Sequence, residues 1–378
     1  LTLVGDDTND PLTVGGTFNG GTGGATLVVL AQRGAANLSL PGGAIYNNLT
    51  LTPSAAETIG FGGGVTVAGT LLINSGNANL VPGASVAADV VEMNALGAAI
   101  NLNTNSDTLT CRNYTQSNGT LTTSNVAASV TITDGAAGST VNISGGAINT
   151  NAAGASNFDF VFSNANNTGL TSSIALGQCS FTGGTTTLSE TVTIGFASIT
   201  GGGVDLTGTG LLSVEDLTMS SGSLTTRDVA AAVTVTGAGA SVVDISGGSI
   251  SAVAMGNNHD FVFSNSTGTS LESSVNLGRV SVPSNTTTLT NNVSAAIVRI
   301  TGGALDAAAS TLGVSTSITL SSGSLDCGSG SVSTVTLSIS GTGALTTDTG
   351  GPPTACAARA ISSPAITPSA PSSQPPSG

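Results

Sequence analysis

The chain has 378 residues, a formal net charge of −14, 53 glycines and only 7% charged residues. Twenty acidic residues stand against six arginines and no lysine, which excludes nucleic acid and anionic membrane surfaces as main partners, because both require clustered cations. Hydrophobic residues make up 39% of the chain and recur at even spacings, unlike those of disordered chains. The composition predicts a folded protein with a thin core and a neutral polar surface.

The N-terminal segment combines a strand pattern with an acidic turn. Leu1–Val4 alternates, and Asp6, Asp7 and Asp10 follow it. Carboxylate oxygens suit Ca²⁺, but the spacing matches neither an EF-hand nor the nonapeptide calcium repeat. A calcium site and a solvated turn therefore both remain open. The glycine-rich run Gly15–Gly24 predicts turns, because a P-loop needs a lysine that the chain lacks.

Neither a membrane span nor a signal peptide is evident. No apolar run approaches the roughly 18 residues of a transmembrane helix. Because the chain begins at Leu1 rather than Met, we expect a mature product whose leader has been removed. Asn-X-Ser/Thr triplets mildly favour an extracellular, glycosylated surface, and they begin at Asn37, Asn48, Asn113, Asn118, Asn142, Asn166, Asn265, Asn285 and Asn292.

Most of the chain alternates apolar and polar residues over short segments separated by Ser/Thr-Gly turns. ITGGGV from Ile199 and ISGGSI from Ile245 are examples. Alternation at period two predicts strands, and no 12-residue segment with helical periodicity separates them, which excludes βαβ folds. Turn glycines lie one or two steps of roughly 20 residues apart, at Gly76, Gly97, Gly119, Gly145, Gly183, Gly201, Gly222, Gly247, Gly302, Gly323 and Gly343.

A unit of about 20 residues with two or three short strands is typical of one coil of a parallel β-helix. The predicted fold is therefore all-β, a right-handed parallel β-helix (β-solenoid) over residues 1–350. About 17 coils at a strand spacing of roughly 4.8 Å would give a rod on the order of 80 Å long.

The resemblance to a known class is carried by Gly43–Leu80, which runs GAIYNNLTLTPSAAETIGFGGGVTVAGTLLINSGNANL. This segment resembles the repeats of bacterial surface β-helix proteins, including adhesins and chains like autotransporter passengers. The similarity of repeat pattern extends over about 300 residues. It implies a β-helix at the cell surface and identifies no ligand, because many functions share this fold.

A larger unit of about 100 residues occurs twice in tandem, near residues 111–213 and 214–315. Leu121–Thr133 reappears as Leu224–Thr236, and the DFVFSN that begins at Asp159 returns from Asp260. Both copies keep the pattern of strands and glycine turns, so the duplication predicts equivalent coils in the two halves of the rod.

The C-terminal segment, residues 351–378, holds seven of the twelve prolines and lacks strand alternation. It predicts a Pro/Ser/Ala-rich tail or strap. Cys111 and Cys179 would lie about three coils apart, roughly 14 Å, which is beyond the roughly 7 Å Cα limit for a disulfide. Cys327 and Cys356 form the candidate disulfide, and a bridge from Cys356 to another subunit is the alternative.

Motifs for catalysis are nearly absent. His259 precedes Asp260, an arrangement that nucleophilic catalysis could use, but its equivalent in the first copy is Phe158, which favours a packed ring. Asp159 and Asp260 would lie roughly 24 Å apart, against the about 5 to 9.5 Å of glycoside hydrolases. An outward stripe is the interpretation of the recurrent Asp205, Asp244, Asp306 and Asp326. We expect no enzyme, no catalytic residue and no cofactor.

The expected function is that of a structural extracellular protein: a self-assembling filament, sheath or fibre subunit at the cell surface. Its main partner would be a further copy of itself, joined end to end, with the C-terminal segment strapping the joint. A glycan-binding surface adhesin is the alternative. A phage or virus fibre and a polysaccharide-degrading enzyme are less favoured.

Overall fold

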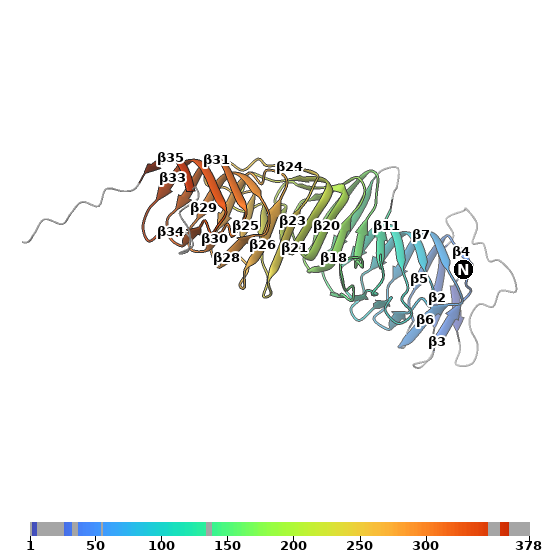
Figure 1. Ribbon diagram of the computed structural model, residues 1–378. Coiled ribbons are helices and arrows are strands. Elements are labelled where there is room, and N and C mark those ends of the chain that lie inside the picture. Colours follow the sequence, from blue (N-terminus) through green and yellow to red (C-terminus); the bar gives the residue numbers. More distant parts are fainter. Residues whose placement is uncertain are drawn as a thin grey trace, which may run out of the picture.

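The computed structural model describes residues 2–5, 26–31, 37–53, 56–133, 138–346 and 356–362, with side chains from residue 38 to residue 346 of these ranges. Every regular element in this part of the chain is a β-strand, and the strands stack in parallel coils into an elongated rod (Figure 1). About 15 coils succeed one another, about 20 residues apart along the chain. The predicted all-β parallel β-helix is confirmed.

The strands are short, and most have between three and ten residues. In chain order they are β1 (Thr2–Gly5), β2 (Thr26–Ala31), β3 (Asn37–Leu40), β4 (Ile45–Tyr46), β5 (Asn48–Leu51), β6 (Glu57–Phe61), β7 (Val65–Ile73), β8 (Ala78–Leu80), β9 (Val86–Met93), β10 (Ala99–Asn101), β11 (Leu109–Gln116), β12 (Thr120–Thr122), β13 (Val130–Ile132), β14 (Ser139–Ile143), β15 (Ala147–Asn149), β16 (Phe160–Phe162), β17 (Asn167–Ser172), β18 (Leu176–Phe181), β19 (Thr185–Leu188), β20 (Thr191–Leu206), β21 (Leu211–Thr225), β22 (Val233–Val235), β23 (Ser241–Ile245), β24 (Ser249–Ser251), β25 (Phe261–Phe263), β26 (Thr269–Ser273), β27 (Arg279–Val282), β28 (Thr286–Leu289), β29 (Val293–Ile300), β30 (Ala304–Asp306), β31 (Thr311–Leu320), β32 (Ser324–Asp326), β33 (Ser331–Ile339), β34 (Ala344–Thr346) and β35 (Cys356–Ser362).

Strands of successive coils pair in register and form three columns along the rod. Column I is traced by Leu109, Val130, Phe160, Cys179, Ala197, Leu217, Val243, Leu271 and Leu289. Column II is traced by Tyr114, Val141, Leu170, Leu188 and Leu206. Column III contains β3, β6, β8, β10, β12 and β15 in the first half, and in the second half it is traced by Leu212, Val233, Phe261, Val280, Val298, Ile318 and Leu337.

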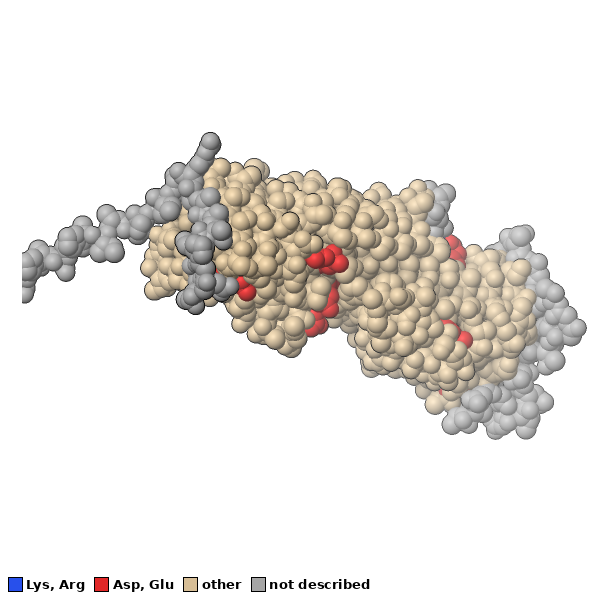
Figure 2. Space-filling model, viewed as in Figure 1, with Lys and Arg blue, Asp and Glu red and all other residues tan. Residues whose placement is uncertain are grey.

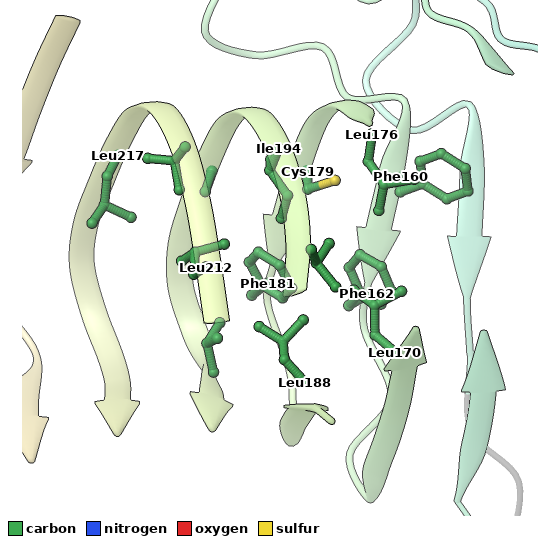
Figure 3. Packing of buried hydrophobic residues seen from close by; sticks show 14 of the residues in the cluster. Phe160, Phe162, Leu170, Leu176, Cys179, Phe181, Leu188, Ile194, Leu212 and Leu217 are labelled. Carbon is green, nitrogen blue, oxygen red and sulfur yellow. The ribbon is translucent and has the colours of Figure 1, made fainter. Parts of the chain in front are cut away.

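Alternation places one apolar set inside every coil, where equivalent residues stack on one another. In Figure 3 the labelled side chains of neighbouring coils point into the same narrow interior. The Phe162 and Phe181 rings stack there with centroids 5.0 Å apart, and Tyr114 meets Phe160 edge to face. Offset stacks of this kind add to the apolar area that the fold removes from water. The core is thus a continuous ladder, and each coil depends on the coils above and below it.

The Ser/Thr-Gly turns require glycine because neighbouring coils approach closely. Gly222 has φ of +84°, and a Cβ there would lie 2.0 Å from the carbonyl oxygen of Gly202 on the preceding coil. Gly323 repeats this arrangement against Gly303, also at 2.0 Å. An L-residue at either turn would meet both a left-handed backbone and a clash. The close stacking of coils therefore explains the glycine pattern of the sequence.

The register shows that equivalent parts of the two large copies occupy different columns. Five successive register pairs along column I connect Val130 to Val243. Its equivalent by sequence, Val233, lies in column III. One copy therefore spans five coils minus one of the three faces. As a result, each residue of the second copy lies one face away, around the rod axis, from its equivalent in the first copy.

Two strands end the described rod. β1 pairs with β2, and among the described residues it has no other strand partner. Within the segment predicted as a tail, Cys356–Ser362 instead forms β35, which adds a strand to β33. The rest of residues 351–378 lies outside the described part of the chain. Parallel stacking thus continues to the last described strand at each end.

Candidate functional site

The loop between β15 and β16 in the first copy and the loop between β24 and β25 in the second copy are each anchored by a buried aspartate. Asp159 is 0% exposed, and its Oδ1 accepts the Thr123 hydroxyl and the backbone N–H of Asn151 at 3.1 Å and of Ala152 at 3.2 Å. Its Oδ2 accepts the N–H of Gln178 at 2.7 Å. A buried carboxylate is tolerated only when its oxygens are satisfied in this way. The group ties the loop to the next coil.

Asp260 repeats the same arrangement in the second copy. Its Oδ1 accepts the Thr226 hydroxyl and the N–H groups of Val253 at 3.0 Å and Ala254 at 3.1 Å, and its Oδ2 accepts the N–H of Arg279 at 2.8 Å. Each aspartate is therefore saturated by groups of its own copy. Neither carboxylate is available to the other as a catalytic partner.

The two loops are closed by different side chains. In the first copy Phe158 stacks on Phe196, with ring centroids 6.2 Å apart. In the second copy His259 takes the place of Phe158, and two arginines reach the loop. Arg279 donates to the carbonyl oxygens of Asn258 and Gly256, and Arg299 donates to Asn257 Oδ1 at 2.9 Å. The apolar ring contact of the first copy is therefore replaced by polar contacts from two arginines in the second copy.

His259 is packed against the loop, as the sequence predicted for this ring. It is 8% exposed, and its Nδ1 lies 3.2 Å from the carbonyl oxygen of Ala230. Desolvation lowers the pKa of the imidazole below its usual 6.5, although the Ala230 contact opposes this shift. With Nδ1 at a backbone carbonyl and the Asp260 carboxylate occupied by other donors, the geometry fits a structural role.

A solvent-open groove of about 600 Å³ lies between columns I and II of the second copy. Ile245 and Val293 border the groove but are themselves buried, 0% and 4% exposed. The accessible walls are polar and include Glu272, Asn291 and Thr311. These residues follow the column I strands, or begin the column II strands, of successive coils. The groove therefore runs along one corner of the rod and is lined by residues of several successive coils.

Two carboxylates lie opposite each other beside this groove, and Glu272 is the one that lines it. Asp244 lies directly opposite Glu272 on the neighbouring coil. A side-chain hydrogen bond with Asp244 raises the pKa of Glu272, and desolvation adds to it. Asp244 Oδ1 is buried and has no hydrogen-bond partner. In the first copy neutral residues stand here, with Thr171 donating to Asn142 at 3.3 Å. Like charges directly opposite repel, and the second copy therefore has an unfavourable acidic pair at this corner where the first copy is neutral.

The predicted aspartate stripe is only partly formed. Asp306 and Asp326 are register partners on adjacent coils, and each accepts the N–H two residues ahead. Asp205 pairs with threonines, Thr187 and Thr225. Asp244 faces Glu272 instead. The recurrence of aspartate in the sequence therefore predicted neighbouring positions only for Asp306 and Asp326. It did not predict the pair of Asp244 with Glu272, because Glu272 belongs to no repeated motif.

The cysteines fall into two classes. Cys111 and Cys179 are buried and free, and burial raises the pKa of Cys111 to about 12. The register places them three coils apart. Cys327 is 2% exposed and takes part in a disulfide. The side chain of Cys356 lies outside the described residues, so the pairing of Cys327 with Cys356 stays a prediction.

The calcium candidates Asp6, Asp7 and Asp10 also lie outside the described residues. Within the described ranges, no group of three or more His, Cys, Asp or Glu side chains is arranged to hold a metal ion. No helix long and apolar enough to cross a membrane occurs in the same ranges. Compared with known proteins, the chain matches no protein family, no curated protein and no solved structure.

Proposed function

We propose that the chain is a structural subunit of an extracellular filament, sheath or fibre that assembles end to end. The observation that carries this proposal is the continuation of parallel pairing to β1 and β35, each with a partner on one side only among the described strands. An unpaired strand edge is a template for a strand of another chain. A contact between opposite ends is heterologous and propagates into a fibre unless it closes.

Two further observations support an extracellular setting. Cys327 takes part in a disulfide, and disulfides persist mainly in oxidising compartments outside the cytosol. The surface relies on Ser, Thr, Asn and Gly, since charged residues are only 7% of the chain. Figure 2 shows few acidic and no basic side chains on the face in view. Such a surface resists nonspecific binding to charged polymers.

A glycan-binding adhesin is the second candidate, and the polar groove beside Ile245 is the observation that favours it. Sugar rings commonly pack on exposed aromatic faces, whereas the described aromatic rings of this chain are buried or, for Phe158 and Phe196, stacked on each other. The filament proposal therefore has the stronger support.

Electron microscopy of the purified full-length chain tests the proposal, and we expect rods joined into filaments. Two truncations locate the joint. Ending the chain after residue 350 removes β35 and should abolish or weaken filaments while the β-sheet circular dichroism persists. Ending it after Ser362 keeps β35 and should leave assembly unchanged if the strand edge makes the joint. A full-length chain that stays monomeric at high concentration would refute the filament function.

A further inference from the structure

One corner of the rod is recessed between two loops. Where column III leads into column I, three successive coils turn through a single residue, which is Gly177, Gly195 and Glu215 in turn. The coils on either side carry longer loops at this corner, residues 150–159 and 236–240. A cavity of about 460 Å³ lies between these loops, and we call it the notch. Besides the three corner residues, its lining includes Thr150, Thr193 and Gly237.

The floor of the notch is formed by backbone. Leu176 and Ile194, which precede the two corner glycines, are buried and point into the core (Figure 3). A Cβ at Gly177 would lie 2.1 Å from Asp159 Oδ2, so the anchor of the first loop requires a glycine at this corner. A Cβ at Gly195 would lie 3.2 Å from the Gly177 carbonyl oxygen. Because neither corner carries a side chain, a ligand can approach the backbone closely.

Glu215 places a carboxylate at one end of the notch. Its side chain packs on Gly237, where a Cβ would lie 2.8 Å from Glu215 Cγ. Among the residues whose side chains are described, none forms an ion pair or a hydrogen bond with this carboxylate. Desolvation raises the pKa of the adjacent Asp216, a hydrogen bond from the Val242 N–H opposes this shift, and the charge of Glu215 raises it further. The notch is therefore negative, and none of its lining residues is cationic.

The first copy fills the equivalent position with an ion pair. At the offset of 103 residues that relates Leu121 to Leu224, the equivalent of Glu215 is Arg112. Arg112 lies opposite Asp89 on the preceding coil and donates to both of its carboxylate oxygens, at 2.7 and 2.8 Å. Glu215 instead lies opposite a glycine of the preceding coil. The second copy therefore keeps one charged group and leaves open the place of its partner.

We propose that the notch binds a guanidinium or ammonium group on a basic side chain of a partner polypeptide, which pairs with Glu215 above Gly195. A guanidinium is flat and donates in a fixed fork, so it fits over a glycine backbone and against a carboxylate. The four arginines with described side chains are bonded elsewhere in the rod, so none of them supplies this cation. The proposal is independent of the filament function, because it needs no contact between rods.

The first test titrates the full-length chain with Nα-acetylarginine amide, whose guanidinium is its one charge. We expect calorimetry to give a dissociation constant on the order of 1 mM at low salt, weakened about tenfold by Glu215→Gln. The uncharged citrulline analogue should bind the wild-type chain equally poorly. Glu92→Gln removes a carboxylate from a distant coil and is the matched control, which should leave binding unchanged. Equal weakening by both variants, or equal binding of the two probes, would overturn the proposal.

The second test supplies the cation from the chain itself. Gly195→Arg places a guanidinium opposite Glu215, as in the pair of Arg112 with Asp89 but with the charges exchanged between the coils. We expect this variant to lose probe binding and to melt about 1 °C higher than Gly195→Gln, its uncharged control of similar length. Adding Glu215→Gln to both variants should remove the difference. A difference that persists without Glu215, or undiminished probe binding by Gly195→Arg, would contradict the proposed pairing.

A longer probe tests whether the cation belongs to a polypeptide. The notch runs along the rod axis and has hydroxyl groups of Thr150 and Thr193 on its walls, so a peptide backbone has partners there. We expect an end-blocked pentapeptide with a central arginine and four glycines to bind more tightly than the single amino-acid amide. Equal affinities would overturn the polypeptide source of the cation.

Discussion

The two copies of the large unit share their anchor and differ in their surface. Asp159 and Asp260 accept equivalent sets of N–H and hydroxyl donors, whereas Phe158 on Phe196 in one loop is replaced by His259 and two arginines in the other. The interior of the coil dictates the anchor, since an unsatisfied buried group is costly. The outer part of each loop is under no such constraint, so it accommodates either aromatic or cationic side chains. Divergence between the copies is therefore concentrated where new contacts can arise.

The largest expected effect tests whether the cores of the two copies are equivalent. Ile143→Asp and Ile245→Asp each place a carboxylate at a position that is 0% exposed. Each should cost more than about 4 kcal/mol of unfolding free energy, because a buried unpaired charge has no partner. Denaturant unfolding followed by circular dichroism measures the loss. Val242→Asp, at a position 48% exposed, is the control, and a comparable loss there would contradict the assigned faces.

The second prediction concerns the anchors. Asp159→Ala and Asp260→Ala each leave three backbone N–H groups without their acceptor, and the expected cost is about 2 to 4 kcal/mol in either copy. Limited proteolysis should open the loop of the changed copy alone. If Asp260→Ala costs far less than Asp159→Ala, then Arg279 and Arg299 hold the second loop and the aspartates are not equivalent.

A smaller difference is expected between the glycine turns of the two copies. Gly119 and Gly222 both have positive φ, +78° and +84°, but a Cβ at Gly119 meets the Ala98 carbonyl at 2.7 Å and the flexible Met93 side chain at 2.9 Å. At Gly222 the first contact is backbone at 2.0 Å. Both alanine variants should lose about 1 to 2 kcal/mol from backbone strain. Gly222→Ala should lose more, and equal melting temperatures would refute the closer approach.

The smallest effect is a dependence on pH that only the second copy shows. Burial lowers the pKa of His259 below 6.5, so between its folded pKa and about 6.5 the unfolded chain binds a proton that the folded chain does not. The contribution to stability is present above about 6.5 and is lost as the pH falls through this window. His259→Phe, which restores the residue of the first copy, should lose less melting temperature between neutral and mildly acidic pH. An identical slope would contradict the burial of a neutral ring.

The sequence predicted the fold well because a β-helix repeats its signal in every coil. Alternation at Ile199 and Ile245 and the glycine turns were sufficient, since each coil meets the same constraint. The surface features lack that redundancy. The acidic pair depends on the register that places Glu272 opposite Asp244, and the loop before β25 depends on how Arg279 and Arg299 reach it from later coils. Neither arrangement repeats, so no periodic signal marked them.

The one-face rotation between the copies limits how this chain can vary by further duplication. A rod built from more such units would turn each new loop to the next corner, and a third copy would be needed before all three corners carried one. The successive loops would then follow a helical path around the rod axis. Lengthening the protein by whole units would therefore change the direction in which it meets its neighbours, and a change in length would also be a change in geometry of assembly.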